Sequence, residues 1–169
     1  MTFSYLLVAV LPLALIAAAV FDVATYKIPN WLSLALALVF PLAALDAGMS
    51  LGEFGMHMGV GLVVLVAGFG LFAARLIGGG DAKLLAATSL WMGEGALVQF
   101  FIYAALVGGL LALALILFRV APLPRAVSGV TWIERLHGRQ RGVPYALALA
   151  IGGLIAAPSS LLVKTLFIA

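Results

Sequence analysis

Long apolar runs separated by short polar segments are the feature that most constrains the fold of this chain. Of its 169 residues, 66% are hydrophobic and only 9% are charged, whereas an ordinary soluble domain has about 25% charged residues. A globular protein this apolar could not cover its surface with polar groups, so we expect an integral membrane protein that crosses the lipid bilayer several times. The runs lie at residues 3–21, 31–48, 56–77, 82–93, 96–118 and 145–166.

The lengths of these runs predict helices. A helix needs about 20 apolar residues to cross the hydrocarbon core, and five of the six runs come close to that length. The run at 82–93 is shorter, and it lies between two glycine-rich segments at 78–80 and 93–95. We therefore predict an all-α fold of about six transmembrane helices, with a short fourth helix that forms a tight hairpin with the fifth. Residues 1–169 are expected to form one membrane-embedded domain.

Basic residues are distributed unevenly between the two sides of the predicted bundle. If the N-terminus lies outside, eight of the nine basic residues fall on the inner side, and only Lys164 is left outside. Because cytoplasmic loops carry the excess of Lys and Arg in membrane proteins, we predict that both termini lie outside. The eight inner residues are Lys27, Arg75, Lys83, Arg119, Arg125, Arg135, Arg139 and Arg141.

The longest polar connection, residues 119–144, allows two interpretations. It holds five arginines and three prolines. Residues 127–136 could form a helix that lies on the membrane surface. The alternative, which we favour, is a basic anchor on the cytoplasmic side without a further role.

Composition also argues against several kinds of site. The chain has no cysteine and two histidines without ligand spacing, so we expect no metal site. The basic residues lie between apolar runs and form no patch on a soluble face, which argues against nucleic-acid binding. No histidine is placed to activate a serine, and His57 is expected to have a structural role near the outer end of the third helix.

Small residues let transmembrane helices approach closely, so glycines inside the runs are expected to serve helix packing. This interpretation is structural and implies no chemistry. The glycines are Gly55, Gly59, Gly108, Gly109, Gly152 and Gly153.

Two of the six carboxylates, Asp22 and Asp81, do not have an easy structural explanation. The other four lie in outer loops or among arginines. Both Asp22 and Asp81 adjoin apolar helices on the same, cytoplasmic, side of the predicted bundle. The short helix at 81–92 would rise about 18 Å against a hydrocarbon core of about 30 Å. If its recessed end is the inner one, Asp81 lies at membrane depth, where ionisable groups are costly and mark functional sites.

Two carboxylates that share a partly dry site can hold one proton between them. Such a pair can hydrolyse a peptide bond, because the ionised member takes a proton from water while the protonated member polarises the scissile carbonyl. Spacing alone does not distinguish this pair from charges that mark helix boundaries. It also leaves open a proton- or ion-coupled transporter, which would use intramembrane carboxylates as a relay, and a structural subunit of a secretion complex.

The neighbours of the two aspartates fit either interpretation. Lys27 and Lys83 could tune a nearby carboxylate or anchor helix ends. Asn30 is a good N-cap for a helix that starts at Trp31, and Pro29 keeps the preceding chain extended. The glycines at 78–80 would let the backbone bend tightly beside Asp81.

Three segments resemble motifs of one known family. Gly78-Gly79-Gly80-Asp81-Ala82-Lys83-Leu84-Leu85 resembles the GxGD signature of intramembrane aspartyl proteases, in the form found in type IV prepilin peptidases. Asp22 followed by Lys27-Ile28-Pro29-Asn30 resembles that family's first aspartate motif. Pro144-Tyr145 with the alanines that follow resembles its late PYxxA segment. The three matches occur in the family's order and span most of the chain.

This resemblance implies an aspartyl endopeptidase of the bacterial inner membrane that removes the short basic leader of prepilins at the cytoplasmic face. It implies Asp22 and Asp81 as the catalytic pair and no cofactor. Its implied partners are prepilins within the lipid bilayer, and it leaves open a homo-oligomer or contact with the pilus assembly machinery. The supporting or substrate-contacting residues would be Lys27, Ile28, Pro29, Asn30, Gly78, Gly79, Gly80, Lys83, Pro144 and Tyr145.

The chain departs from the family's longer members in one respect. Those members carry a cytoplasmic domain with paired CxxC motifs that is linked to zinc and to N-methylation of the new terminus. This chain has no cysteine, and only about nine residues separate its first two runs. We therefore expect no methyltransferase activity. The chain resembles the short form that serves Flp (tight-adherence) pili, with preflagellin peptidases as a close relative that the sequence leaves open.

Overall fold

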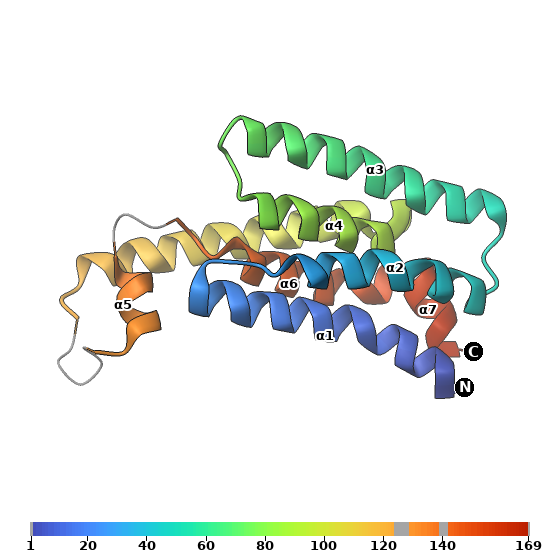
Figure 1. Cartoon of the computed structure of the whole chain (residues 1–169), viewed down its shortest axis with the longest axis horizontal. Helices are drawn as coiled ribbons and strands as arrows, with labels where there is room; N and C mark the ends of the chain where they lie inside the picture. Colours follow the sequence, from blue (N-terminus) through green and yellow to red (C-terminus); the bar gives the residue numbers. More distant parts are fainter. Residues whose placement is uncertain (1, 124–128, 139–141, 169) are drawn as a thin grey trace.

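The computed structural model is a bundle of helices in which long segments run side by side (Figure 1). It describes residues 2–123, 129–138 and 142–168, and every regular element in these residues is helical. The all-α prediction is therefore confirmed. The elements are α1 (Thr2–Thr25), α2 (Asn30–Asp46), α3 (Leu51–Ala73), α4 (Gly79–Val120), α5 (Thr131–His137), α6 (Tyr145–Ala156), a 3-10 turn at Ala157–Ser159, and α7 (Leu161–Ile168).

Helix α4 consists of two arms that meet at Gly93. Gly93 has φ 59° and ψ −169°, a backbone conformation that is essentially restricted to glycine. A Cβ atom at this position would overlap the ring of His57. Figure 1 shows the chain turning back after the first arm (residues 79–92, green) and returning as the second arm (residues 94–120, yellow). The short fourth helix and its hairpin with the fifth are thus present as predicted.

Three helices of the described chain are long and apolar enough to cross a membrane. They are α1, α3 and α4, while α2 and the segment Tyr145–Ser159 are shorter apolar helices. The chain is thus a membrane protein by composition and helix length. The count of six transmembrane helices stays a prediction.

The last apolar run is interrupted, contrary to the single helix predicted for 145–166. Helix α6 ends at Ala156, the 3-10 turn contains Pro158, and α7 begins at Leu161. Proline lacks a backbone N–H and clashes with the preceding helical turn, so Pro158 breaks the run. The Ser160 hydroxyl in this break donates to the Trp91 carbonyl oxygen at 2.7 Å, which fastens the break to α4.

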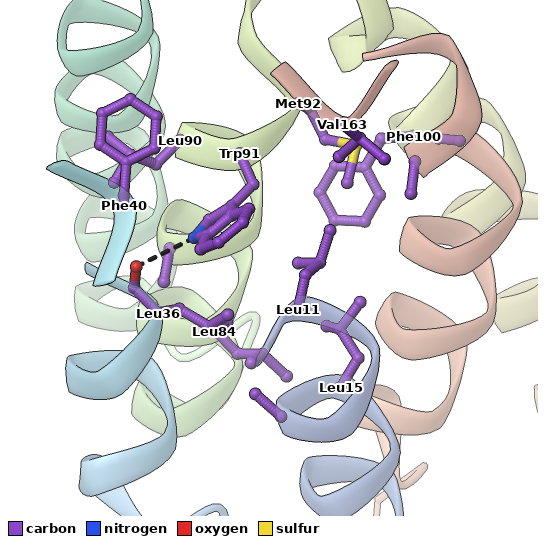
Figure 2. Close-up of a cluster of buried hydrophobic side chains, with 14 of the residues drawn as sticks. Leu11, Leu15, Leu36, Phe40, Leu84, Leu90, Trp91, Met92, Phe100 and Val163 are labelled. Atoms are coloured by element: carbon purple, nitrogen blue, oxygen red, sulfur yellow. Dashed lines mark hydrogen bonds between the residues drawn. The ribbon is translucent and has the colours of Figure 1, made fainter. Parts of the chain in front are cut away.

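Trp91, at the end of the first arm of α4, lies at the centre of the apolar core. Its side chain is fully buried, and its Nε1–H donates to the backbone carbonyl of Leu36 at 2.9 Å. Figure 2 shows Trp91 between Phe40 of α2 and Leu11 of α1. The hydrogen bond satisfies the indole in an apolar interior, where an unpaired N–H would be costly. The tryptophan therefore fixes α2 against the first arm of α4.

Glycines permit close approach in two places. At Gly152 of α6, a Cβ atom would lie 2.6 Å from the backbone nitrogen of Ala104, so α6 and the second arm of α4 pack backbone to backbone, as predicted. On α3, the buried residues His57, Gly61, Val64 and Gly68 form one narrow stripe. The packing prediction for Gly55, Gly59 and Gly109 is wrong, because nothing lies within 4 Å of any of these Cβ positions. The packing glycines of α3 are Gly61 and Gly68.

We predict that Gly152→Ala destabilises the bundle by about 1–3 kcal/mol, the usual cost of overpacking a tight contact. The matched control is Gly109→Ala in the second arm of α4, where nothing lies within 4 Å of the added Cβ. That variant should be as stable as the parent or slightly more stable. Thermal unfolding of the purified protein in detergent measures both effects, and equal stability of the two variants would contradict the close α4–α6 contact.

Candidate active site

The three motif segments meet at one end of the bundle. In Figure 1, the C-terminal end of α1 and the starts of α2, α4 and α6 lie away from the N-terminus, while α5 and the last part of α4 extend further to the left. Specific contacts join these segments, although 124 residues separate Asp22 from Ala146 in sequence. The arrangement therefore brings together residues that the sequence distributes over most of the chain.

Asp22 lies in the last turns of α1 and is buried, with 5% of its surface exposed. Its Oδ2 accepts a hydrogen bond of 2.9 Å from the backbone N–H of Ala146, in the first turn of α6. Free N–H groups and the helix dipole make a helix N-terminus a good partner for a negative charge. The helix α1 ends just after Asp22, where Tyr26 adopts a left-handed conformation (φ 56°) and donates its N–H to the Asp22 carbonyl.

Asp81 lies in the first turn of α4. Its carboxylate interacts with the backbone N–H of Gly78. Its Oδ1 is buried and has no hydrogen-bond partner within the described residues. The two aspartates are close enough to interact electrostatically, and Tyr145 also lies within the electrostatic range of Asp81. The site thus contains two carboxylates, of which one is held by a helix N-terminus and the other presents an unpaired oxygen.

Each glycine of the 78–80 segment faces a different neighbour. A Cβ at Gly78 would lie 2.7 Å from the Asp81 carboxylate, and a Cβ at Gly80 would lie 3.1 Å from the side chain of Ile28. A Cβ at Gly79 would lie 3.2 Å from the ring of Phe72. None of the three has a positive φ. The glycines therefore leave room for three neighbouring side chains, of which one is the Asp81 carboxylate. They do not provide the predicted tight bend in a strained backbone.

Asn30 and Lys83 form a direct contact between the first two motifs. Lys83 Nζ donates to the Asn30 side-chain oxygen at 3.1 Å. Helix α2 begins at Asn30 itself, with Pro29 as an extended N-cap and no side-chain capping bond. The predicted capping role of Asn30 is thus wrong, since its side chain binds the lysine of the other motif.

The remaining predicted residues surround this contact. Lys27 is exposed, and its backbone N–H donates to the Thr25 hydroxyl. Pro144 is buried and precedes α6. The ring of Tyr145 packs on Gly108, where a Cβ would lie 2.7 Å from it. The predicted packing role of Gly108 is confirmed, and its partner is a residue of the site.

Hydrogen bonds that the sequence did not predict hold the connection 119–144 together and join it to the end of α1. Arg119 donates from Nε to the Leu136 carbonyl and from Nη2 to the Gly142 carbonyl, both at 2.8 Å. Arg135 donates to the carbonyl of Ala24, two residues after Asp22, at 3.0 Å. The sequence shows only that this segment is rich in arginine. It does not show which carbonyl oxygen each arginine binds.

A short helix, α5, is present in this connection. It covers Thr131–His137 and has no buried residue, in partial agreement with the surface helix considered for 127–136. Residues 127 and 128 of that range lie outside the described residues.

His57 is distant from the two aspartates in the fold and has a structural role, as expected. Its Nδ1 lies 2.8 Å from the Leu90 carbonyl, and its ring stacks on Phe40. In the part of the chain that the structure describes, no group of three or more His, Asp and Glu side chains could hold a metal ion.

We predict that Arg119→Lys and Arg119→Gln both loosen the connection 119–144. Lysine keeps the charge but cannot reach two carbonyls with the fixed fork of a guanidinium. Losing such charge-assisted bonds should raise the rate of limited proteolysis within this segment by about tenfold. Arg75→Lys, at an exposed position on the same predicted side, is the matched control. Full protection of Arg119→Lys would show that only the charge matters.

Comparison with known proteins assigns the chain to a family. The type IV leader peptidase family matches residues 9–113, a range that contains both aspartates, Ile28–Asn30 and Gly78–Lys83. No curated protein and no solved structure matches the chain. The matched range covers more than half of the 169 residues. The chain is therefore a member of the type IV leader peptidase family, whose members are membrane-embedded hydrolases that act on prepilins.

Proposed function

We propose that Asp22 and Asp81 form the catalytic pair with which this leader peptidase hydrolyses the bond between the leader and the mature part of a prepilin. The observation that carries the proposal is the placement of the two carboxylates at one end of the bundle. They lie on different helices and are close enough to interact electrostatically, and Asp22 is held by the backbone N–H of Ala146.

The different partners of the two carboxylates suggest different roles. A carboxylate that accepts from a helix N-terminus is stabilised in its ionised form, so we assign Asp22 as the base. Asp81 has a buried oxygen without a partner, and an uncompensated charge is costly in a buried site, so we assign Asp81 as the protonated acid. Asp22 would then take a proton from water, while Asp81 gives its proton to the carbonyl oxygen as water attacks.

Collapse of the resulting tetrahedral intermediate restores the pair. Asp22 gives its proton to the leaving amine as the C–N bond breaks, and Asp81 takes a proton from one hydroxyl of the intermediate. The products are a new carboxyl terminus on the leader and a new amino terminus on the pilin. Tyr145, which lies near Asp81, is suited to orient the scissile peptide by a hydrogen bond.

We also propose that the site lies on the cytoplasmic side of the bacterial inner membrane, with both termini outside. The end of the bundle that holds the aspartates also carries Arg119 and Arg135, which supports this orientation through the positive-inside rule. A prepilin would then present its scissile bond at the inner end of its hydrophobic segment. Flp-like prepilins remain our proposed substrates because the chain resembles the short form of the family.

We predict that Asp22→Asn and Asp81→Asn each reduce leader removal by about 10²-fold or more, the usual contribution of one acid–base group. Co-expression with a candidate prepilin and separation of the two forms on a gel measures the effect. Asp46→Asn is the matched control, because Asp46 is an exposed carboxylate at the end of α2. Normal processing by either variant would overturn the proposed pair. Proton flux in liposomes that depends on Asp81, without prepilin cleavage, would favour a transporter instead.

A separate prediction concerns the product. Because the chain contains no cysteine, it lacks the paired CxxC motifs linked to zinc in longer members, and we propose that it does not methylate the new amino terminus. Mass spectrometry of pilin processed by the purified enzyme with added S-adenosylmethionine should give the mass of the unmodified mature chain. The addition of one methyl group would contradict this proposal.

A further inference from the structure

An apolar groove of about 690 Å³ opens between α2, α3 and the first arm of α4. Its walls are hydrophobic except for Asn30, Ser33 and Lys83. Several of the lining side chains are exposed in the folded protein. The exposed fraction is 58% for Trp31, 57% for Leu34 and 61% for Leu62. Nothing in the described chain covers this groove.

The groove exists because α2 and α3 pack on the same arm but diverge from each other. Helix α3 contacts α4 through its narrow buried stripe, and α2 contacts α4 through Leu36 and Phe40 around Trp91. The two helices meet directly at their outer ends, where Phe40 stacks on Phe54 and on His57. From that aromatic contact towards the aspartates, the space between α2 and α3 is open.

The dimensions of the groove fit a helix. Its lining extends from Asn30 to Pro41 on α2 and from Phe54 to Leu65 on α3, which is about 16 Å along each helix. This corresponds to three helical turns. The lining also includes small residues from three helices, Ala37, Gly61 and Ala86, and small residues allow the close approach on which helix packing in lipid depends.

The inner end of the groove adjoins the candidate active site. Lys83 lines the groove two residues after Asp81, and it binds Asn30, which lines the opposite wall. Ile28, two residues before Asn30, contacts Gly80 next to Asp81. A chain that leaves the groove past the Lys83–Asn30 contact therefore arrives beside the two carboxylates.

We propose that this groove holds the hydrophobic helix of the prepilin substrate while its scissile bond lies between Asp22 and Asp81. The proposal rests on the function proposed above. A substrate of this family has to present a peptide bond to the aspartates from within the membrane, and the groove is an apolar path, about three helical turns long, whose inner end adjoins them. The aromatic contact of Phe40 with Phe54 would close its outer end and limit how far the helix can shift.

The test fills the groove without touching the aspartates. Ala37→Trp places a large side chain inside it, at an exposed position where the fold should tolerate the change. The matched control is Ala105→Trp, an exposed alanine on the second arm of α4. With full-length prepilin in liposomes, Ala37→Trp should raise KM by about tenfold or more through lost helix contacts, and Ala105→Trp should behave as the parent enzyme. Equal kinetics for both variants would overturn the proposal.

Photo-crosslinking identifies the occupant directly. A benzophenone amino acid at Leu34 or Leu62 should capture the hydrophobic segment of the prepilin, and the same group at Leu106 on the second arm of α4 should not. Capture of phospholipid alone at positions 34 and 62 would show that the groove is a lipid site and would overturn the proposal. The experiments distinguish failure of the groove proposal from failure of the catalytic pair. If processing depends on both aspartates but is insensitive to Ala37→Trp, only the proposal that the groove binds the substrate helix is rejected. Processing that survives both Asp→Asn changes removes the catalytic pair itself.

Discussion

The reversal of the chain at Gly93 is the constraint on which the rest of the structure depends. It sets the first arm of α4 at residues 79–92, about 21 Å long, against about 40 Å for the second arm, residues 94–120. The end that carries Asp81 is consequently recessed beside a longer helix. The His57 ring occupies the space in which any other residue at position 93 would place its Cβ, and its hydrogen bond to Leu90 fastens the bend. A histidine with a structural role thus helps to set the position of Asp81, the proposed catalytic carboxylate.

Helix α6 supplies a second part of the site. Its Ala146 N–H lies at the same end of the bundle as Asp81 and binds Asp22. Gly152 allows α6 to approach the second arm closely, and this contact places the first turn of α6, with Ala146, against Asp22. Tyr145 packs on Gly108 of that arm. The second arm therefore acts as a common support. It positions the α6 N–H that holds Asp22, while the hairpin positions Asp81, so neither carboxylate depends on a surface loop for its place.

Sequence reasoning predicted the parts of this site that follow from patterns along the chain. The length of the apolar run at 82–93 and the glycines on both sides of it predicted the short fourth helix. The motifs around Asp22 and Asp81 predicted which segments lie close together at the candidate site. It failed where the answer depends on contacts across the bundle. Asn30 was expected to cap its own helix but binds Lys83, and Arg119 was expected to supply charge but holds two carbonyl groups. A polar side chain often has several possible hydrogen-bond partners. The packing of the helices decides which partner it binds, and a local sequence pattern does not show this.

The walls around the glycines at 78–80 have a consequence for motion during catalysis. Three consecutive glycines in an isolated chain would form a flexible hinge, but here the side chains of Asp81, Phe72 and Ile28 occupy the space beside each of them. These neighbours leave the segment less conformational freedom than three consecutive glycines would have alone, and the glycines serve as missing volume. In the proposed mechanism, contacts that place Asp81 in this way would spare the enzyme part of the entropy of ordering its carboxylate in each turnover.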